Sequence, residues 1–418
     1  MTLFPDHGLP LEVVLDGLAA GARDHDPVRS GPASFSLEVN ADLQRVIRTA
    51  FARYLTHNPV FGEALPSLAR IERELVSMGA EICGGGPAAT GFVTLGGSES
   101  IFTALHAARE RARASGRHGD GPYEVVASET IHPAHAKACH YLGLLLVGVP
   151  YRDDLRADVE AMAAAITPAT IALCASAPQW PHHRFDDVEA VAALARDREL
   201  WCHVDACVGG YLAPFVRAAG WPVPPYDFSV PGVCSMSADL HKWGYAAKPA
   251  STVLFADGEL ARWAPPPPVP WDCGMYATGS VAGSRPGASV AAAWAVLRFL
   301  GRDGFTQLAS RTMTVRDSIV AGLDAIDGIR TRSTDLAMVV YGGADGVDSD
   351  ALGDALVRRG WLVMRLVRPE PMLQLLVDRL EDEFVEVFLA DVAAAVDEVR
   401  SAGSGGTSPA GRGSGAYG

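Results

Sequence analysis

Two residues with complementary chemistry stand 37 positions apart in the middle of the chain. Asp205 comes at the end of an apolar run, and Lys242 follows His241 and precedes an aromatic- and glycine-containing stretch. A deprotonated lysine amine forms a Schiff base with an aldehyde, and a carboxylate can hold a protonated pyridine nitrogen. Together these are the groups that a protein contributes to pyridoxal phosphate (PLP) chemistry. Taken singly, Lys242 could equally be a surface lysine and Asp205 a helix cap or a structural ion pair.

A glycine-rich turn precedes a long amphipathic segment and is a candidate anion site. Gly96 and Gly97 let the backbone approach an anion closely, and the helix that we expect from about Ser100 offers free N–H groups at its positive end. Ser98 adds a hydroxyl donor. The same residues also suit an ordinary strand-to-helix turn, so the turn alone is a weak signal.

Two further cations are candidates for contact with an anionic substrate group. Lys248 follows Lys242 by six residues and could meet such a group or carry a proton. Arg285 lies in the loop Gly283–Gly287 and could form a forked pair with a carboxylate or phosphate. The alternative for Arg285 is a structural role in which it ties loops together.

Several histidines fall near these segments. His132 could stack on a pyridine ring or move protons near neutral pH, and its alternative is a loop or helix-cap histidine. The spacing of His132, His135 and His140 matches no strong ligand motif, so we expect no metal site. We expect His182 and His183 to lie at the edge of a pocket rather than to bind a metal as a pair.

Short apolar runs alternate with amphipathic segments from about residue 91 onward. The alternation predicts an α/β fold with a covered, mainly parallel sheet. Ligands bind such sheets at the carboxyl ends of the strands, which is where Asp205 falls. The expected strands are residues 125–127, 144–149, 170–175, 201–204, 233–236 and 252–255, and the expected helices are residues 100–114, 135–141, 159–165, 188–197 and about 288–300.

The 418 residues suggest more than one lobe. We expect an N-terminal arm with helices at 1–80, a large domain at 81–300, a smaller C-terminal α+β domain at 301–400 and a disordered Gly- and Ser-rich tail at 401–418. A stiff loop should run from Pro265 to Gly287.

Composition narrows the class of protein. The net charge is −14 with no extended basic run, which disfavours nucleic-acid binding. Seven cysteines without CxxC spacing favour a reducing cytoplasm over a disulfide framework. The N-terminus lacks the pattern of a secretory signal, and the longest apolar run is far shorter than the ~20 residues of a membrane helix, so we expect a soluble protein without a membrane anchor.

Five segments resemble a known family when they are taken together. They are Gly96–Ser100, Ala177–His182, His203–Gly210, Ser237–Gly244 and Gly283–Gly287. In this order they resemble sphingosine-1-phosphate lyase and, more broadly, the group II PLP-dependent decarboxylase superfamily, over about residues 57–390. The resemblance implies a fold type I enzyme with a seven-stranded sheet, and an obligate homodimer whose active sites lie at the subunit interface.

The resemblance also assigns roles toward the cofactor. Lys242 would bind the cofactor aldehyde, Asp205 would pair with the pyridine nitrogen and His132 would stack on the ring. The residues that would hold the cofactor phosphate are Gly97, Ser98 and His241, with Ser284 reaching across from the partner subunit.

Substrate contacts follow in the same way. His182 and Lys248 match positions near the substrate, with Lys248 also a catalytic candidate, and Arg285 falls in the family's loop. The lyases carry a histidine three residues after the Asn of an Asn-Pro motif, where it helps to bind the substrate's phosphate. Here Asn58-Pro is followed by Val and then Phe61, so an anion donor has become an apolar ring. That departure favours a substrate other than a phosphorylated amino alcohol, such as an amino acid.

The expected reaction is cleavage of a bond next to an amine. Loss of Cα–Cβ would be a retro-aldol reaction that yields an aldehyde, and loss of Cα–carboxylate would release CO₂. Both use the same electron sink, so the motifs leave the two open. A transaminase, or a PLP-binding homologue kept as a scaffold, are the remaining alternatives.

Overall fold

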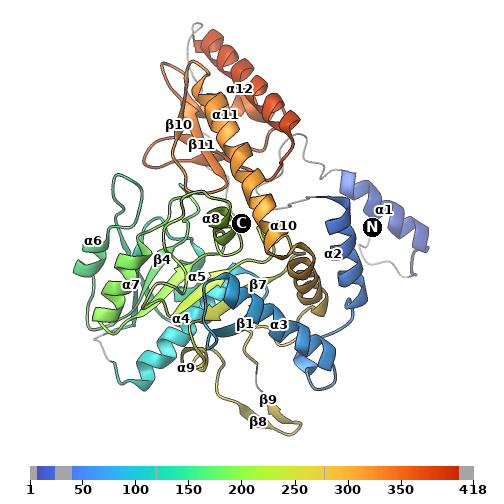
Figure 1. The fold of residues 1–418 in the computed structure, drawn as a ribbon, viewed down its shortest axis with the longest axis vertical. Coiled ribbons are helices and arrows are strands. Elements are labelled where there is room, and N and C mark those ends of the chain that lie inside the picture. The colour runs from blue at the N-terminus through green and yellow to red at the C-terminus, as the bar shows by residue number, and fades with distance from the viewer. Residues whose placement is uncertain (1–6, 24–39, 118–120, 277, 404–418) are drawn as a thin grey trace.

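The computed structural model describes residues 7–23, 40–117, 121–276 and 278–403. Figure 1 shows a large unit and a smaller one, with the long helix α10 (Gly287–Asp324) running from the first into the second. A seven-stranded sheet forms the centre of the large unit, and a four-stranded sheet lies in the small one. None of the helices in the described ranges has the length and apolarity that crossing a bilayer requires.

The large sheet is mainly parallel, as the sequence predicts. Its strands are β1 (Thr90–Thr94), β2 (Glu124–Ser128), β3 (Leu145–Val149), β4 (Thr170–Ser176), β5 (Trp201–Asp205), β6 (Ser235–Ala238) and β7 (Ser251–Phe255). They lie in the order β1-β7-β6-β5-β4-β2-β3. Strands β6, β5, β4, β2 and β3 run parallel, whereas β7 is antiparallel to both of its neighbours. Strand β1, antiparallel to β7, points the same way as these five, so the carboxyl ends of six strands meet at one edge.

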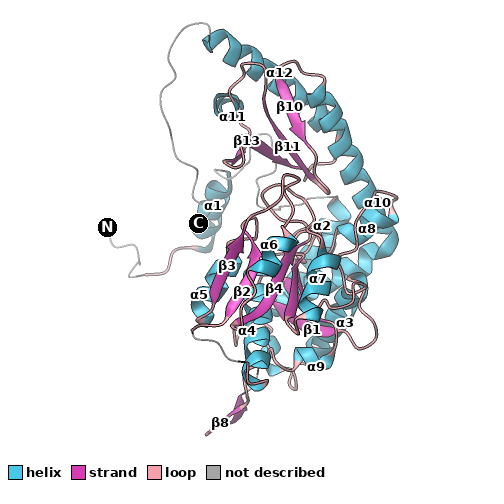
Figure 2. Cartoon of the chain, turned by 90° about the vertical axis from the view of Figure 1, so that its left-hand side faces the viewer, coloured by secondary structure: helices cyan, strands magenta, loops and turns pink. Residues whose placement is uncertain are grey.

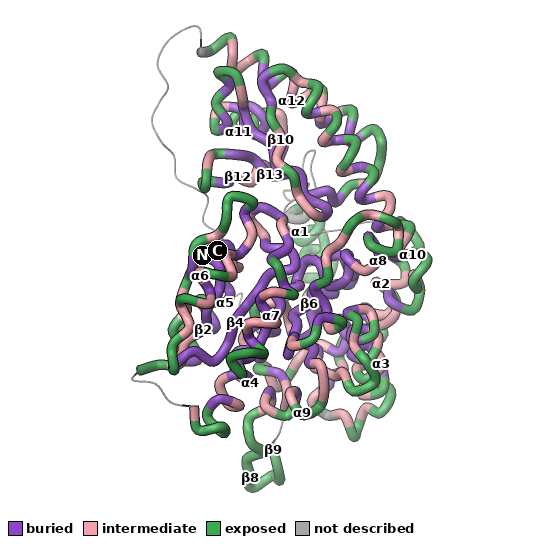
Figure 3. The backbone as a smooth tube through the Cα atoms, turned by 60° about the vertical axis from the view of Figure 1, so that its left-hand side comes forward, coloured by how far each residue is buried: buried purple, intermediate pink, exposed green. Residues whose placement is uncertain are grey.

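Alternate residues of the central strands pack into two separate cores. Val126 of β2 belongs to one core, and its neighbours Val125 and Ala127 belong to the other, because successive side chains point to opposite faces of a sheet. The helices of the first face are α3 (Pro66–Ile82), α6 (Val159–Ala164), α7 (Val188–Asp197) and α8 (Ala213–Ala218), and those of the second are α4 (Gly97–Ala114), α5 (Ala134–Leu142) and α9 (Gly258–Ala261). Figure 3 shows the sheet buried between them.

The small unit is an antiparallel sheet covered by helices. Its strands are β10 (Ile329–Arg332), β11 (Met338–Gly343), β12 (Met364–Leu366) and β13 (Met372–Leu376), in the order β10-β11-β13-β12, and its helices are α11 (Ser349–Arg358) and α12 (Asp382–Gly403). Figure 2 shows this sheet above the larger one, beside the far end of α10. Helix α10 breaks at Gly301, where φ is 57° and ψ is −174°, so the helix expected to end near residue 300 resumes after this glycine.

Three features differ from the sequence-based expectations. Strand β1 was not expected, because it lies at the sheet edge and three of its five residues are only partly buried. The proline-rich loop contains a hairpin of β8 (Val269–Trp271) and β9 (Gly274–Tyr276), which projects from the large unit in Figure 1. Helix α12 continues through residues 401–403, so the expected disordered tail is wrong there, and residues 404–418 lie outside the described part of the chain.

The N-terminal region contains helices, as expected for the arm. They are α1 (Leu11–Arg23), α2 (Ala41–Arg53) and the short 3₁₀ helix η1 (Pro59–Phe61). Helix α1 carries large apolar side chains that remain 44–67% exposed, namely those of Leu11, Val14, Leu15 and Leu18. Helix α2 in contrast packs on the large unit through Leu43, which is fully buried.

Candidate functional site

A cavity of about 720 Å³ lies at the carboxyl edge of the parallel strands. Loops that follow β2, β4, β5 and β6 line it, together with the N-terminus of α4. Seven of the residues singled out from the sequence line this one space, namely Gly96, Gly97, Ser98, His132, Asp205, His241 and Lys242. The fold thus brings together residues that are up to 146 positions apart, and the cavity is the candidate active site.

Asp205 is the buried acid of the cavity. It is the last residue of β5, and its Oδ1 accepts hydrogen bonds from the N–H of Cys207 and from the hydroxyl of Ser237, both at 3.1 Å. Burial alone would raise the pKa of Asp205, but the imidazoles of His135 and His132 and the hydrogen bond from Cys207 lower it to about 2. Asp205 is therefore a carboxylate at neutral pH and can accept a hydrogen bond from a protonated ring nitrogen.

His132 offers a neutral aromatic face. It follows β2, and its Nδ1 accepts the N–H of Ala134 at 3.1 Å at the start of α5. In the neutral ring the proton therefore sits on Nε2. Burial, with the nearby Lys242 ammonium, lowers the pKa of His132 against the opposing pull of Asp205 and Asp239. A neutral imidazole that lines the cavity suits stacking on a cationic ring.

Lys242 is held by a carboxylate that the sequence analysis did not single out. Its Nζ lies 2.9 Å from Oδ2 of Asp239, and the two residues are three apart in the turn after β6. Burial would lower the pKa of Lys242, but the charge and hydrogen bond of Asp239 outweigh burial and raise it. The signal was present in the sequence, because Asp239 stands inside the segment that resembles the lyases and directly after a strand.

The N-terminus of α4 forms a cradle of backbone N–H groups. The N-cap of this helix is Gly96, and no side chain caps it among the described residues. Since the first N–H groups of a helix have no intrahelical partner, those of Gly97 and Ser98 are available to an anion. A Cβ on Gly97 would come within 2.5 Å of Sγ of Cys207 and 3.0 Å of Oδ2 of Asp239, so the close packing requires glycine.

His241 stands beside this cradle. Its Nδ1 accepts the N–H of Ala250 at 3.1 Å, so the neutral ring carries its proton on Nε2, which lies 3.8 Å from Oδ2 of Asp239. Burial lowers its pKa against the opposing pull of Asp239. The ring also lies near Gly96, whose added Cβ would be 3.6 Å from its Cε1. An Nε2–H donor next to free backbone amides suits a phosphate group.

The residues present fit pyridoxal phosphate. The cavity holds a lysine amine for the aldehyde, a carboxylate for the ring nitrogen and N–H donors for the phosphate. Oδ1 of Asp239 is buried and has no hydrogen-bond partner among the described residues, so it remains available to a further donor. Among the described residues no cluster of His, Cys, Asp or Glu has the form of a metal site.

The remaining candidates do not line the cavity within one chain. Lys248 is exposed and donates from Nζ to the carbonyl of His241 at 3.3 Å. His182 is buried two residues beyond the lining residue Trp180, and burial and Arg332 lower its pKa to about 4. The side chain of Phe61 lies outside the described part of the structure.

Ser284 and Arg285 pack against the N-terminal region. Asn58 donates to Oγ of Ser284 at 3.0 Å and accepts the N–H of Arg285 at 3.2 Å. The guanidinium of Arg285 pairs with Glu72 of α3 at 2.7 Å. Within one chain Arg285 therefore makes the contacts of a structural residue that ties loops together, which was the alternative to substrate binding. The nearby residues Val281 and Ala282 line the cavity instead.

Comparisons with known proteins agree with this geometry. The protein-family model for the pyridoxal-dependent decarboxylase conserved domain matches residues 42–326. Sphingosine-1-phosphate lyase of Dictyostelium discoideum is 34% identical over 369 residues, which cover 87% of this chain and 69% of that protein. A probable L-tyrosine/L-aspartate decarboxylase of Methanothermobacter thermautotrophicus is 31% identical over 335 residues, which cover 78% of this chain and 88% of that protein.

A solved structure gives the same result in three dimensions. Sphingosine-1-phosphate lyase of Burkholderia pseudomallei superimposes with a TM-score of 0.89 at 29% identity, and the match covers 96% of this chain and 93% of that chain. The chain spans a smaller share of some relatives, such as 56% of the rat lyase. The chain belongs to the pyridoxal-dependent decarboxylase family, and it is a PLP-dependent lyase similar to the sphingosine-1-phosphate lyases.

Proposed function

We propose that this enzyme breaks a carbon–carbon bond next to an amine, by retro-aldol cleavage of an amino alcohol or amino acid to give an aldehyde. One observation carries the proposal: Lys242 and Asp205 line the same cavity at the carboxyl edge of the sheet. The likeness to lyases over most of the chain favours aldehyde formation over CO₂ release.

Each residue of the site has a separate role toward the cofactor. When bound, pyridoxal phosphate supplies an aldehyde for an amine and a pyridinium ring that accepts the electron pair of the breaking bond. Lys242 would provide the amine that anchors the ring, and Asp239 beside it pairs with Nζ and holds it at this place in the cavity. Asp205 holds its negative charge toward the ring nitrogen, and His132 supports the ring from one face.

The cavity wall indicates the kind of substrate. Apolar and aromatic side chains form much of it, including those of Ile101, Phe102, Tyr141 and Trp180, and Lys137 adds a cation. An amine with an apolar portion and an anionic group fits this surface. We propose that Lys248, His182 and Arg285 also serve the substrate, as the family resemblance implies. With phenylalanine at position 61, a substrate phosphate would depend on the charges of Lys248 and Arg285, since His182, with a pKa of about 4, is neutral.

We propose a homodimer with shared active sites. Ser284 is hydrogen-bonded to Asn58 and does not line the cavity of its own chain, which suits a role in the cavity of a partner. The exposed apolar residues of α1 would gain a cover in such an assembly. We also propose a cytoplasmic location, since the seven cysteines are free thiols and six are buried.

Decarboxylation of an amino acid is the second candidate. The similarity to a probable amino-acid decarboxylase supports it, and the same cavity could serve either bond. The test is to incubate the PLP-loaded enzyme with β-hydroxy amines, their phosphates and amino acids while measuring aldehyde and CO₂, with the K242A variant as the blank. Aldehyde without CO₂ supports the proposal, and CO₂ without aldehyde replaces it with the decarboxylase.

A further inference from the structure

The two oxygens of Asp205 have different surroundings. Oδ1 accepts hydrogen bonds from Cys207 and Ser237, whereas Oδ2 accepts none from the described residues and lies 4.0 Å from Nδ1 of His135. His132 and Lys242 also face Asp205 from the cavity side. Oδ2 is therefore the oxygen left for a ring nitrogen, and His135 stands behind it.

The contacts of His135 fix where its proton lies. Its Nδ1 is 3.1 Å from the carbonyl oxygen of His132, and the other atom near Nδ1 is the carboxylate oxygen of Asp205. Both are acceptors, so Nδ1 must carry the proton. His135 is fully buried, and burial lowers its pKa, which leaves a neutral ring whose Nδ1–H bonds the carbonyl of His132 and lies 4.0 Å from Oδ2 of Asp205.

A second buried histidine, His203, packs beside this ring. The rings of His135 and His203 are 5.9 Å apart between centroids, and Nε2 of each is buried without a hydrogen-bond partner among the described residues. The hydroxyl of Ser235 accepts the indole N–H of Trp201 at 2.8 Å and lies 2.9 Å from Nδ1 of His203. The His203 ring therefore packs beside the His135 ring in the buried interior and limits its movement.

We propose that His135 is a positioning residue for the electron sink, whose Nδ1–H stabilises the Asp205 carboxylate so that the proton shared between Asp205 and a cofactor ring nitrogen stays on the nitrogen. The proposal rests on the proposed PLP chemistry. The shared proton can lie on the nitrogen, which leaves an ion pair, or on Asp205, which leaves two neutral groups. A donor behind the carboxylate stabilises only the ion pair.

The test compares the holoenzyme with H135F and H135N. Phenylalanine keeps the ring and removes the donor, whereas asparagine can keep an N–H near the position of Nδ1. The readouts are the ¹⁵N shift of ring-labelled PLP in the bound state and the ratio of affinities for PLP and its 1-deaza analogue, which has no ring nitrogen. H135F should move the shift toward the unprotonated nitrogen and reduce the affinity ratio by about three- to tenfold, and H135N should restore most of both.

Several outcomes overturn the proposal. If H135F matches the wild type, His135 only fills space, and if H135N fails as H135F does, the donor is not the cause. Should both variants misfold, histidine ¹⁵N spectra of the wild type decide, because the proposal requires the Nδ1–H form of His135 and an Nε2–H form contradicts it. Failure of the proposed function itself is seen separately, as an absence of borohydride-trapped PLP on Lys242 in the wild type.

Discussion

At the scale of single residues, the pairing of Lys242 with Asp239 decides when the amine is reactive. A free amine attacks an aldehyde, but the contact at 2.9 Å holds Nζ as an ammonium. The raised pKa of Lys242 means that its ammonium form stabilises the folded protein at neutral pH and up to the usual lysine range, and that this contribution is lost as pH rises through the folded-state pKa. At neutral pH the pair is therefore intact until a ligand changes its surroundings.

The variant D239N tests this pairing in the protein without cofactor. Burial remains while the opposite charge is lost, so the pKa of Lys242 should fall by about 1–3 units. The measurement is the pH dependence of Lys242 modification by an amine-reactive reagent, read by peptide mass spectrometry. D227N is the matched control, because Asp227 is also buried but pairs with Arg217. An unchanged Lys242 profile in D239N would contradict the role given to Asp239.

The site residues were predictable where a segment carried its own signature. Lys242, Asp205 and His132 stand in such segments and meet in the cavity. Asp239 was overlooked because a carboxylate before a lysine is also an ordinary surface pair, and only the turn after β6 brings the two side chains together. The burial of His135 behind Asp205 depends on how α5 packs on the sheet, which no local pattern reports.

At the scale of elements, the first turn of α4 must pack closely against the residues that follow β5 and β6 and line the cavity. Gly97 permits this approach, because any side chain there would meet Cys207 and Asp239. The strand-to-helix turn was predicted from its glycines, although the helix begins at Gly97 rather than near Ser100. Strand β1, which leads into this turn, was missed because an edge strand lacks the continuous apolar run of β4 or β5.

The variant G97A should lose PLP affinity by about tenfold or more and destabilise the fold by about 1–3 kcal/mol, since an added methyl group cannot be accommodated without a shift. G258A is the matched control. Gly258 is likewise the first residue of its helix, α9, but an added Cβ there meets nothing within 4 Å. PLP titration and thermal unfolding provide both measurements. Equal effects of the two changes would show that the close approach at Gly97 has no special importance.

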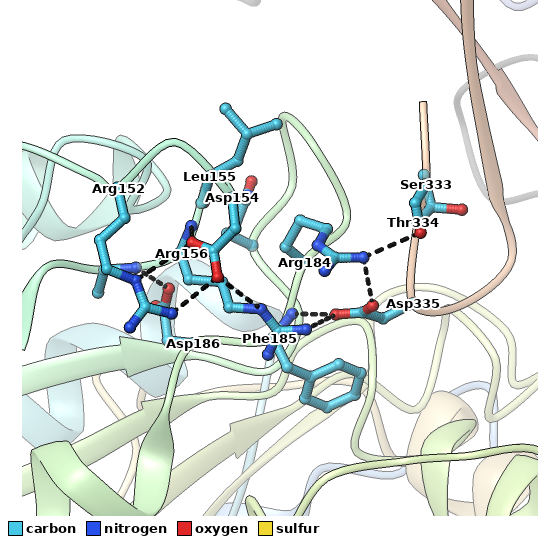
Figure 4. A network of polar contacts seen from close by, with 12 residues as sticks. Arg152, Asp154, Leu155, Arg156, Arg184, Phe185, Asp186, Ser333, Thr334 and Asp335 are labelled. Atoms are coloured by element: carbon cyan, nitrogen blue, oxygen red, sulfur yellow. Dashed lines mark hydrogen bonds and ion pairs between the residues drawn. The ribbon is translucent and has the colours of Figure 1, made fainter. Parts of the chain in front are cut away.

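At the scale of the whole molecule, a polar network joins the small unit to a loop beside the cavity. Asp335 accepts from Arg184 at 2.7 Å, from Arg156 at 3.3 Å and from the N–H of Phe185 at 2.8 Å, as Figure 4 shows. The loop also receives hydrogen bonds from the side chain of Gln374 in β13 to the carbonyl groups around residue 180. These contacts link distant segments, so sequence patterns could predict both units but not how they are fastened together.

The variant D335A should destabilise the protein by about 1–3 kcal/mol, because it leaves two half-buried guanidinium groups and a backbone N–H without their acceptor. D327A removes a carboxylate that is 82% exposed and pairs only at the surface with Arg400, so it should cost about 0–1 kcal/mol. Denaturant unfolding measures both. A loss no greater than that of D327A would show that the network does not hold the units together.

The proposed dimer is also tested at this scale. Replacing Leu15 and Leu18 of α1 by lysine should shift the protein from the mass of two chains toward that of one, because burying an unpaired charge is costly. Light scattering during gel filtration measures the mass, and D16K on the same helix is the control. A dimer that survives the double change would exclude α1 from the interface, and a monomeric wild type would exclude the dimer.

The most direct test of the account is to reduce the PLP-loaded protein with borohydride and map the modified peptide. We expect a single phosphopyridoxyl group on Lys242 and none in K242A, while circular dichroism shows that this variant remains folded. A modification on another lysine such as Lys137 or Lys248, or no modification, would contradict the assignment of the active site.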